Sequence, residues 1–218
     1  MFRRFLALLV AFMTLLGFTA ASSSASNVLD MSLTFKATQQ GNLPTSQTVI
    51  PWATYTHESS GLFVDVRQNF DAVDAASVFI GRVYNLTESG TVQITPELGV
   101  IGGEKFIGLS PEFYIWGKKG SVAFITLNQL AVSDRSNDFL YHWSEVRYVC
   151  SPRLEVGLTW QAYLEPTSGT GASIDGGPLV RVNAGPAYVK AMYNLSLTET
   201  KPSRLDKIFL VVGWTISS

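Results

Sequence analysis

The 218-residue chain has 46% hydrophobic and only 15% charged residues, and its formal net charge is −1. Soluble domains carry roughly 25% charged residues, so this composition is poor in charge for a soluble protein. The sequence has no run of Lys and Arg beyond short pairs, which excludes a nucleic-acid partner, and its length fits one domain.

A basic and then apolar segment opens the chain. Arg3 and Arg4 precede residues 5–18, which carry no charge, and small residues follow up to Ala21 and Ala25. This order predicts a secretory signal peptide over residues 1–25, cleaved after Ala21 or Ala25. No later segment approaches 18 consecutive apolar residues, so the sequence predicts no helical membrane span. The single cysteine, Cys150, cannot form an intramolecular disulfide.

After residue 25, apolar and polar residues alternate in run after run, as in half-buried strands. In the clearest pair, residues 91–116, two such runs flank a turn at Gly102, Gly103 and Glu104. Pro96 and Pro111 lie inside these runs, where a missing N–H predicts a bulge or a strand end. About twelve strands are predicted, with ten as the alternative count: 29–38, 47–57, 61–70, 76–87, the two runs of 91–116, 121–132, 138–149, 153–164, 178–183, 187–197 and 205–216.

The connectors between these strands alternate in length. The first, residues 39–46, is long, the next is short, and short connectors recur at every second position. The longest predicted loop, residues 165–177, contains Glu165 and Asp175 and is expected to be solvated. Long loops on one rim and tight turns on the other are typical of an up-and-down barrel in an outer membrane.

The two faces of the predicted strands differ in chemistry. One face carries large aliphatic and aromatic side chains, which are expected to meet lipid in a membrane barrel, and the polar face is then expected to line the lumen. The predicted lumen-lining residues are Asp65, Arg67, Glu97, Glu112, Glu145, Arg147, Glu155, Arg181 and Lys190. Five acids and four bases nearly cancel, which suits a narrow interior.

Aromatic residues near the ends of the predicted strands suggest girdles at the two membrane interfaces. The predicted interface residues are Trp52, Tyr84, Trp116, Tyr163, Tyr193 and Trp214.

The signal peptide, the alternating hairpins and the long–short connectors together resemble small bacterial outer-membrane β-barrel proteins, porin-like in the broad sense. The resemblance covers residues 27–218 and is architectural; the chain ends in two serines rather than in an aromatic residue. It implies an all-β, up-and-down antiparallel transmembrane barrel in a bacterial outer membrane, in contact with membrane lipid and lipopolysaccharide. The expected function is a passive pore for small solutes or a structural barrel, without enzymatic activity or a cofactor. The sequence indicates no oligomeric state.

Glu97 and Glu112 share the polar face of neighbouring strands and could form an acid–base pair. A two-residue turn at Gly102 and Gly103 would place Glu97 opposite Gly108, leaving the carboxylates about 13 Å apart. A glycosidase-type pair needs roughly 5–9.5 Å, so the sequence predicts no catalysis here.

His142 and Ser144 share the apolar face of their strand, and a lipid-facing His and Ser resemble those of outer-membrane lipid A deacylases. This alternative implies an ester hydrolase, but Glu145 points to the other face and no orienting acid is found. A second alternative is a soluble periplasmic barrel that binds a small ligand. His57 and His142 have no Cys or acid cluster at ligand spacing, so no metal site is predicted.

Overall fold

The computed structural model describes residues 27–40, 43–69, 75–103, 107–133, 138–164, 172–198 and 205–217. The predicted signal peptide lies outside the described residues. Within them, no helix is long and apolar enough to cross a membrane. The strands are β1 (Asn27–Gln40), β2 (Leu43–His57), β3 (Leu62–Asn69), β4 (Ala75–Arg82), β5 (Tyr84–Asn85), β6 (Val92–Gly103), β7 (Ile107–Lys119), β8 (Val122–Ser133), β9 (Phe139–Ser151), β10 (Leu154–Leu164), β11 (Ala172–Ala184), β12 (Ala187–Ser196) and β13 (Leu205–Ser217).

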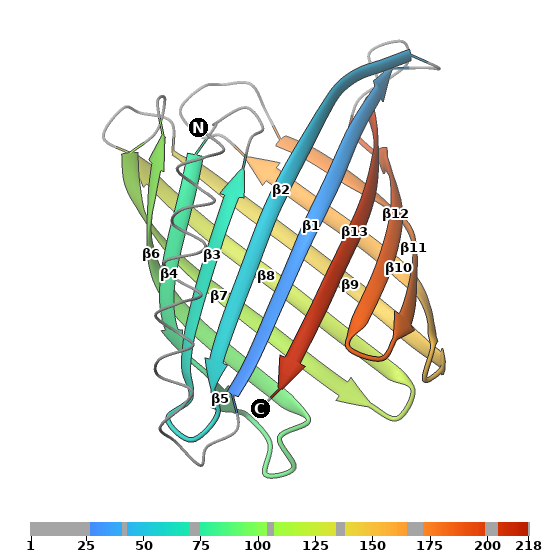
Figure 1. The fold of residues 1–218 in the computed structure, drawn as a ribbon. Coiled ribbons are helices and arrows are strands. Elements are labelled where there is room, and N and C mark those ends of the chain that lie inside the picture. The colour runs from blue at the N-terminus through green and yellow to red at the C-terminus, as the bar shows by residue number, and fades with distance from the viewer. Residues whose placement is uncertain are drawn as a thin grey trace.

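The strands form a closed antiparallel barrel in which each strand pairs with its neighbours in the chain (Figure 1). β1 pairs with β13, which closes the sheet. β4 and β5 pair with β6 in one common register, Gly81 opposite Glu97 and Tyr84 opposite Ile94, so they are one interrupted strand. The barrel therefore has twelve strands. The predicted fold class and strand count are confirmed, and the ten-strand alternative is wrong.

The interruption between β4 and β5 has a local cause. Pro96 of β6 lies between the partners Ile94 and Glu97, at the level where the ladder breaks. Proline has no N–H to donate, so the hydrogen bonding cannot continue there. Pro111 also lies inside its strand, opposite Leu98, and the β6–β7 register shows no shift at either proline. The predicted bulges are therefore not found between these two strands.

The turns on one rim are tight. Gly61, Gly120 and Gly185 adopt positive φ there, at the turns after β2, β7 and β11, and the described N- and C-terminal strand ends meet at the same rim. On the other rim, the predicted long first loop over residues 39–46 is wrong. The strands extend into it, because β1 reaches Gln40 and β2 begins at Leu43. These two strands project beyond the rest of the barrel (Figure 1). The predicted 165–177 loop is also shorter, because β11 begins at Ala172.

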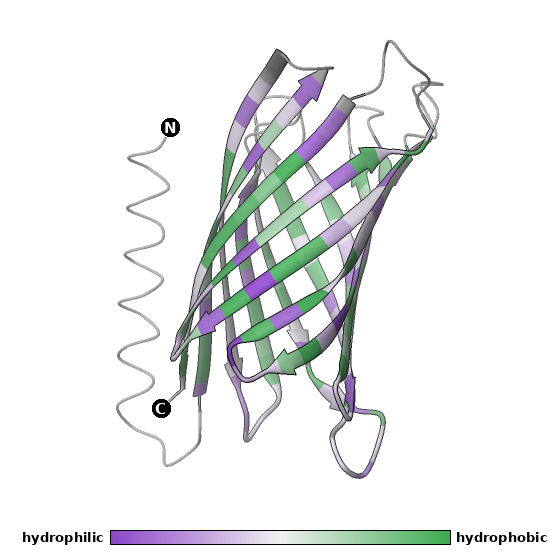
Figure 2. Cartoon of the chain, turned by 90° about the vertical axis from the view of Figure 1, so that its right-hand side faces the viewer, coloured by the Kyte–Doolittle hydropathy of each residue, from purple (hydrophilic) through white to green (hydrophobic). Residues whose placement is uncertain are grey.

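The two faces of the wall differ as the alternation predicts. Apolar side chains point outward, with Leu98 60% and Leu158 61% exposed, whereas Asp65 and Glu112 point inward and are 0% and 3% exposed. Hydrophilic and hydrophobic segments alternate along the strands nearest the viewer in Figure 2. A water-soluble barrel would bury its apolar face, so the soluble-barrel alternative is not supported.

Candidate functional site

The nine charged residues predicted to line the lumen form two separate groups inside the barrel. The structure places the nine predicted residues on strands whose polar face points inward. Arg181 and Lys190 have side chains that are 23% and 16% exposed, and the other seven are at most 13% exposed. Asp65, Arg67, Glu97 and Glu112 lie on β3, β6 and β7; Glu145, Arg147, Glu155, Arg181 and Lys190 lie on β9 to β12.

The first group centres on Arg67. Its guanidinium Nη2 donates to Asp65 Oδ2 at 2.8 Å and to Glu112 Oε1 at 2.5 Å. Two aromatic rings, of Trp52 and Phe79, contact the guanidinium at 4.9 and 4.5 Å from their centroids. Ion pairs and ring contacts together hold the cation in one position inside the barrel.

Glu97 completes this group through the strand register. It lies directly opposite Glu112 in the β6–β7 ladder, and the separation of about 13 Å expected from a two-residue turn is wrong. Pairing continues only as far as Gly102 and Ile107, so the connection is longer than two residues. Carboxylate oxygens of Asp65, Glu97 and Glu112 lie within 4.8 Å of one another, and we call these three residues the acidic cluster.

The second group, which we call the paired network, contains two acids and three bases. Arg147 Nη1 donates to Glu155 Oε2 at 2.9 Å, and Lys190 Nζ donates to Glu145 Oε1 at 2.5 Å. Arg181 Nε lies 3.9 Å from Glu155 Oε1. Each acid therefore has a cationic partner, unlike the acids of the acidic cluster, which share one guanidinium.

Two further acids inside the barrel were missed from the sequence. Asp175 is 2% exposed and accepts hydrogen bonds from Gln161 Nε2 at 3.0 Å and Lys207 Nζ at 2.5 Å. The predicted solvated loop at Asp175 is wrong, because Asp175 lies on β11 and its side chain points to the same face as that of Arg181. Asp30 accepts from Thr215 Oγ1 at 2.6 Å and Tyr188 Oη at 3.3 Å. Asp30 lies on the polar face of the first predicted strand, and this position could have predicted that it points inward.

The six predicted interface aromatics divide between the faces. Tyr84, Tyr193 and Trp214 are outward and 48%, 39% and 43% exposed. Placing the other three at the lipid interface was wrong. Trp52 lies opposite Arg67 and packs against Tyr114 inside the barrel, at 6.2 Å between ring centroids.

Tyr163 and Trp116 also belong to the inner face. Tyr163 stacks on Phe139 at 5.4 Å, within an apolar cluster inside the barrel. Trp116 shares the face of Glu112 and Tyr114 on β7. These residues were assigned from their nearness to strand ends, and strand parity decides their direction instead.

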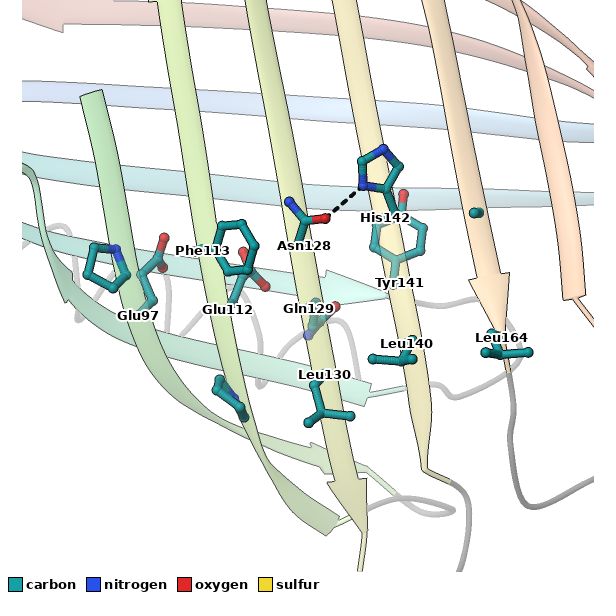
Figure 3. Close-up of a pocket in the computed structure, with 13 residues that line it drawn as sticks. Glu97, Glu112, Phe113, Asn128, Gln129, Leu130, Leu140, Tyr141, His142 and Leu164 are labelled. Atoms are coloured by element: carbon teal, nitrogen blue, oxygen red, sulfur yellow. Dashed lines mark hydrogen bonds between the residues drawn. The ribbon is translucent and has the colours of Figure 1, made fainter. Parts of the chain in front are cut away.

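His142 and Ser144 lie on the outer wall, and Asn128 of β8 supplies the partner that the sequence did not indicate. His142 Nδ1 lies 2.8 Å from Asn128 Oδ1 (Figure 3). His142 Nε2 lies 2.8 Å from Ser144 Oγ. However, Ser144 is 3% exposed and donates to Thr126 Oγ1, and Trp160 Nε1 already donates to His142 Nε2 at 3.0 Å. The His142 nitrogen that would act as the base thus already accepts a hydrogen bond, and the Ser144 hydroxyl that would act as the nucleophile is buried.

A depression of about 600 Å³ lies on the wall beside His142 (Figure 3). Most of its lining side chains point outward, including Phe113, Leu130 and Leu140, which are 41%, 39% and 43% exposed. The depression therefore faces lipid and is not a passage through the barrel.

No protein-family model matches the chain, and no curated protein matches its sequence. Among solved structures, the chain is similar to the NanC porin, with a TM-score of 0.66 at 6% identity over 84% of this chain and 98% of that one. The KdgM porin gives 0.58 at 10% identity, over 84% and 98%. An outer-membrane channel from Pseudomonas putida F1 gives 0.57 at 8% identity, over 89% and 96%. None of these supports the ester-hydrolase alternative. The chain has the fold of bacterial outer-membrane channel barrels.

Proposed function

We propose that this protein is an outer-membrane barrel that lets small solutes cross passively, without enzymatic activity. The observation that carries the proposal is the segregation of the wall into an exposed apolar exterior and a charged interior across a closed twelve-strand barrel. Lipid solvates such an exterior, and a polar interior serves solutes that lipid excludes.

The packing of the interior supports a narrow passage. Phe79 and Leu179 point inward and are 0% and 1% exposed, and Met192 and Phe209 beside Leu179 are 3% and 4% exposed. Side chains therefore fill much of the barrel at these levels. Passage is therefore expected to be restricted to ions and small solutes. If the interior were fully closed, the protein would serve as a structural barrel instead of a pore.

The charge of the interior bears on solute choice. A solved structure of the KdgM porin contains disordered oligogalacturonate. In this chain the acidic cluster on β3, β6 and β7 would repel an acidic oligosaccharide along that wall. Neutral or cationic small solutes are therefore the proposed class.

The experiment is a conductance measurement on the folded barrel. The protein is purified from outer membranes, and a faster-running unboiled band on a detergent gel identifies the folded form. Planar bilayers then measure conductance and cation selectivity, and liposome swelling measures passage of small neutral sugars. Small, cation-preferring conductance is expected. Folded protein with neither conductance nor swelling would overturn the pore and leave the structural barrel.

A further inference from the structure

The acidic cluster contains more carboxyl groups than cations. Its three carboxyl groups face one guanidinium, that of Arg67, so full ionisation would leave two uncompensated negative charges. The charged groups that act on Glu97 are Asp65, Glu112 and Arg67. Burying uncompensated charge is costly, so the cluster must take up either protons or a further cation.

Glu97 is the residue left without a partner. It is 6% exposed, and within the described part of the chain neither of its carboxylate oxygens has a hydrogen-bond partner. Oε2 of Glu112 is likewise unpartnered there, because Arg67 binds only Oε1. Three carboxylate oxygens on directly paired residues of β6 and β7 are thus available to one ligand.

From this geometry we propose that Glu97 and Glu112 bind one divalent cation of the Ca²⁺ type inside the barrel, with Asp65 adding charge beside it. Hard divalent cations take oxygen ligands, and Ca²⁺ accepts a carboxylate in bidentate fashion and a flexible geometry. Mg²⁺ demands near-ideal octahedral geometry and keeps several waters, so it fits this crowded site less well. A charge of +2 balances the cluster. Binding of the ion does not require that solutes pass through the barrel, although a bound ion would reduce the negative charge that the cluster presents to them.

Arg67 limits how the ion sits. It holds Asp65 through both Nε and Nη2, at 3.3 and 2.8 Å, so this carboxylate is already used on both oxygens. Asp65 therefore contributes mainly long-range attraction, and Glu97 supplies the principal ligand. Removing the charge of Glu97 removes the site while leaving the Arg67 ion pairs in place.

Aromatic rings beside the cluster provide a local reporter. Tyr114 lies two residues from Glu112 on the same face of β7, and Trp52 contacts both Tyr114 and Arg67. Tb³⁺ occupies Ca²⁺ sites and emits when nearby Trp or Tyr rings are excited. The folded barrel is titrated with Tb³⁺ in detergent, both as purified and after refolding in Ca²⁺ followed by removal of free ion.

The expected result is saturable emission from one Tb³⁺ per barrel that Ca²⁺ displaces, and at least tenfold weaker binding in Glu97→Gln. Glu88→Gln, the same change at an exposed turn residue, is the matched control and should titrate like the wild type. Ca²⁺ should also raise the melting midpoint of the wild type and of Glu88→Gln, but not of Glu97→Gln.

The proposal is overturned if emission does not saturate in either preparation, or if Glu97→Gln binds Tb³⁺ as tightly as Glu88→Gln does. The unboiled gel band confirms that each variant is folded, so lost binding is not confused with lost structure. Conductance is measured separately, and its absence would overturn the proposed pore without affecting this result.

Discussion

Glu97 on β6 lies directly opposite Glu112 on β7, and Arg67 binds Glu112 but not Glu97. Two carboxylates at paired positions on one face repel each other unless a cation lies between or beside them. Arg67 supplies one such cation from β3, across the interrupted strand formed by β4 and β5. The stability of this wall therefore depends on one guanidinium.

Replacing Arg67 with Met should destabilise the barrel by about 3–5 kcal/mol, because Asp65 and Glu112 would lose their buried cationic partner. Urea unfolding in detergent, followed by tryptophan fluorescence, measures the change. Arg153→Met, at an exposed turn, is the control and should change stability by less than about 0.5 kcal/mol. Equal stability of the two variants would show that the Arg67 ion pairs contribute nothing.

Phe79→Ala should increase single-channel conductance, because Phe79 is fully buried inside the barrel and its ring covers the Arg67 guanidinium. The same substitution at Phe113, which points into the lipid, should leave conductance unchanged. Planar bilayer recordings compare the two. A conductance increase in Phe113→Ala alone would contradict the assignment of the faces.

Gly99→Ala should destabilise the barrel by about 1–3 kcal/mol, because the new methyl group would meet the ring of Phe79. Gly102→Ala places the same methyl group on the same strand, where no atom of a non-neighbouring described residue lies within 4 Å. Its stability should match that of the wild type. The temperature at which the faster-running unboiled gel band disappears is measured for both variants. Equal midpoints for Gly99→Ala and Gly102→Ala would argue against close packing at Phe79.

Ser144→Ala should leave lipid acylation unchanged, since Trp160 already donates to the ring nitrogen of His142 that would act as the base. Mass spectrometry of lipopolysaccharide and phospholipid from cells with wild-type and variant protein provides the test. The His142→Gln variant is examined in parallel. Loss of acyl chains with the wild type but not with either variant would establish an ester hydrolase and overturn the non-enzymatic proposal.

Strand parity could be predicted from the sequence, because side chains alternate strictly along an extended chain. Arg67 and Asp65 alternate with apolar neighbours, and that pattern alone assigns them to one face. The same rule would have assigned Trp52 and Tyr163 to the interior, had it been preferred over nearness to a strand end. The sequence predicts a loop at Asp175 because Gly176 and Gly177 follow it, whereas all three residues are part of β11.

The sequence alone therefore determined the all-β class and which face of each strand is apolar, because these depend on local periodicity. It predicted about twelve strands with ten as the alternative, and the strand pairing of the closed barrel decided for twelve. The tertiary structure alone decided which residue lies opposite Glu97, because register depends on where a turn begins and how many residues it uses. A turn placed too early moves Glu97 from Glu112 to Gly108 and removes the acidic cluster. Contacts between β3 and β7 depend further on barrel closure, which brings Arg67 to Glu112 across 45 residues of sequence.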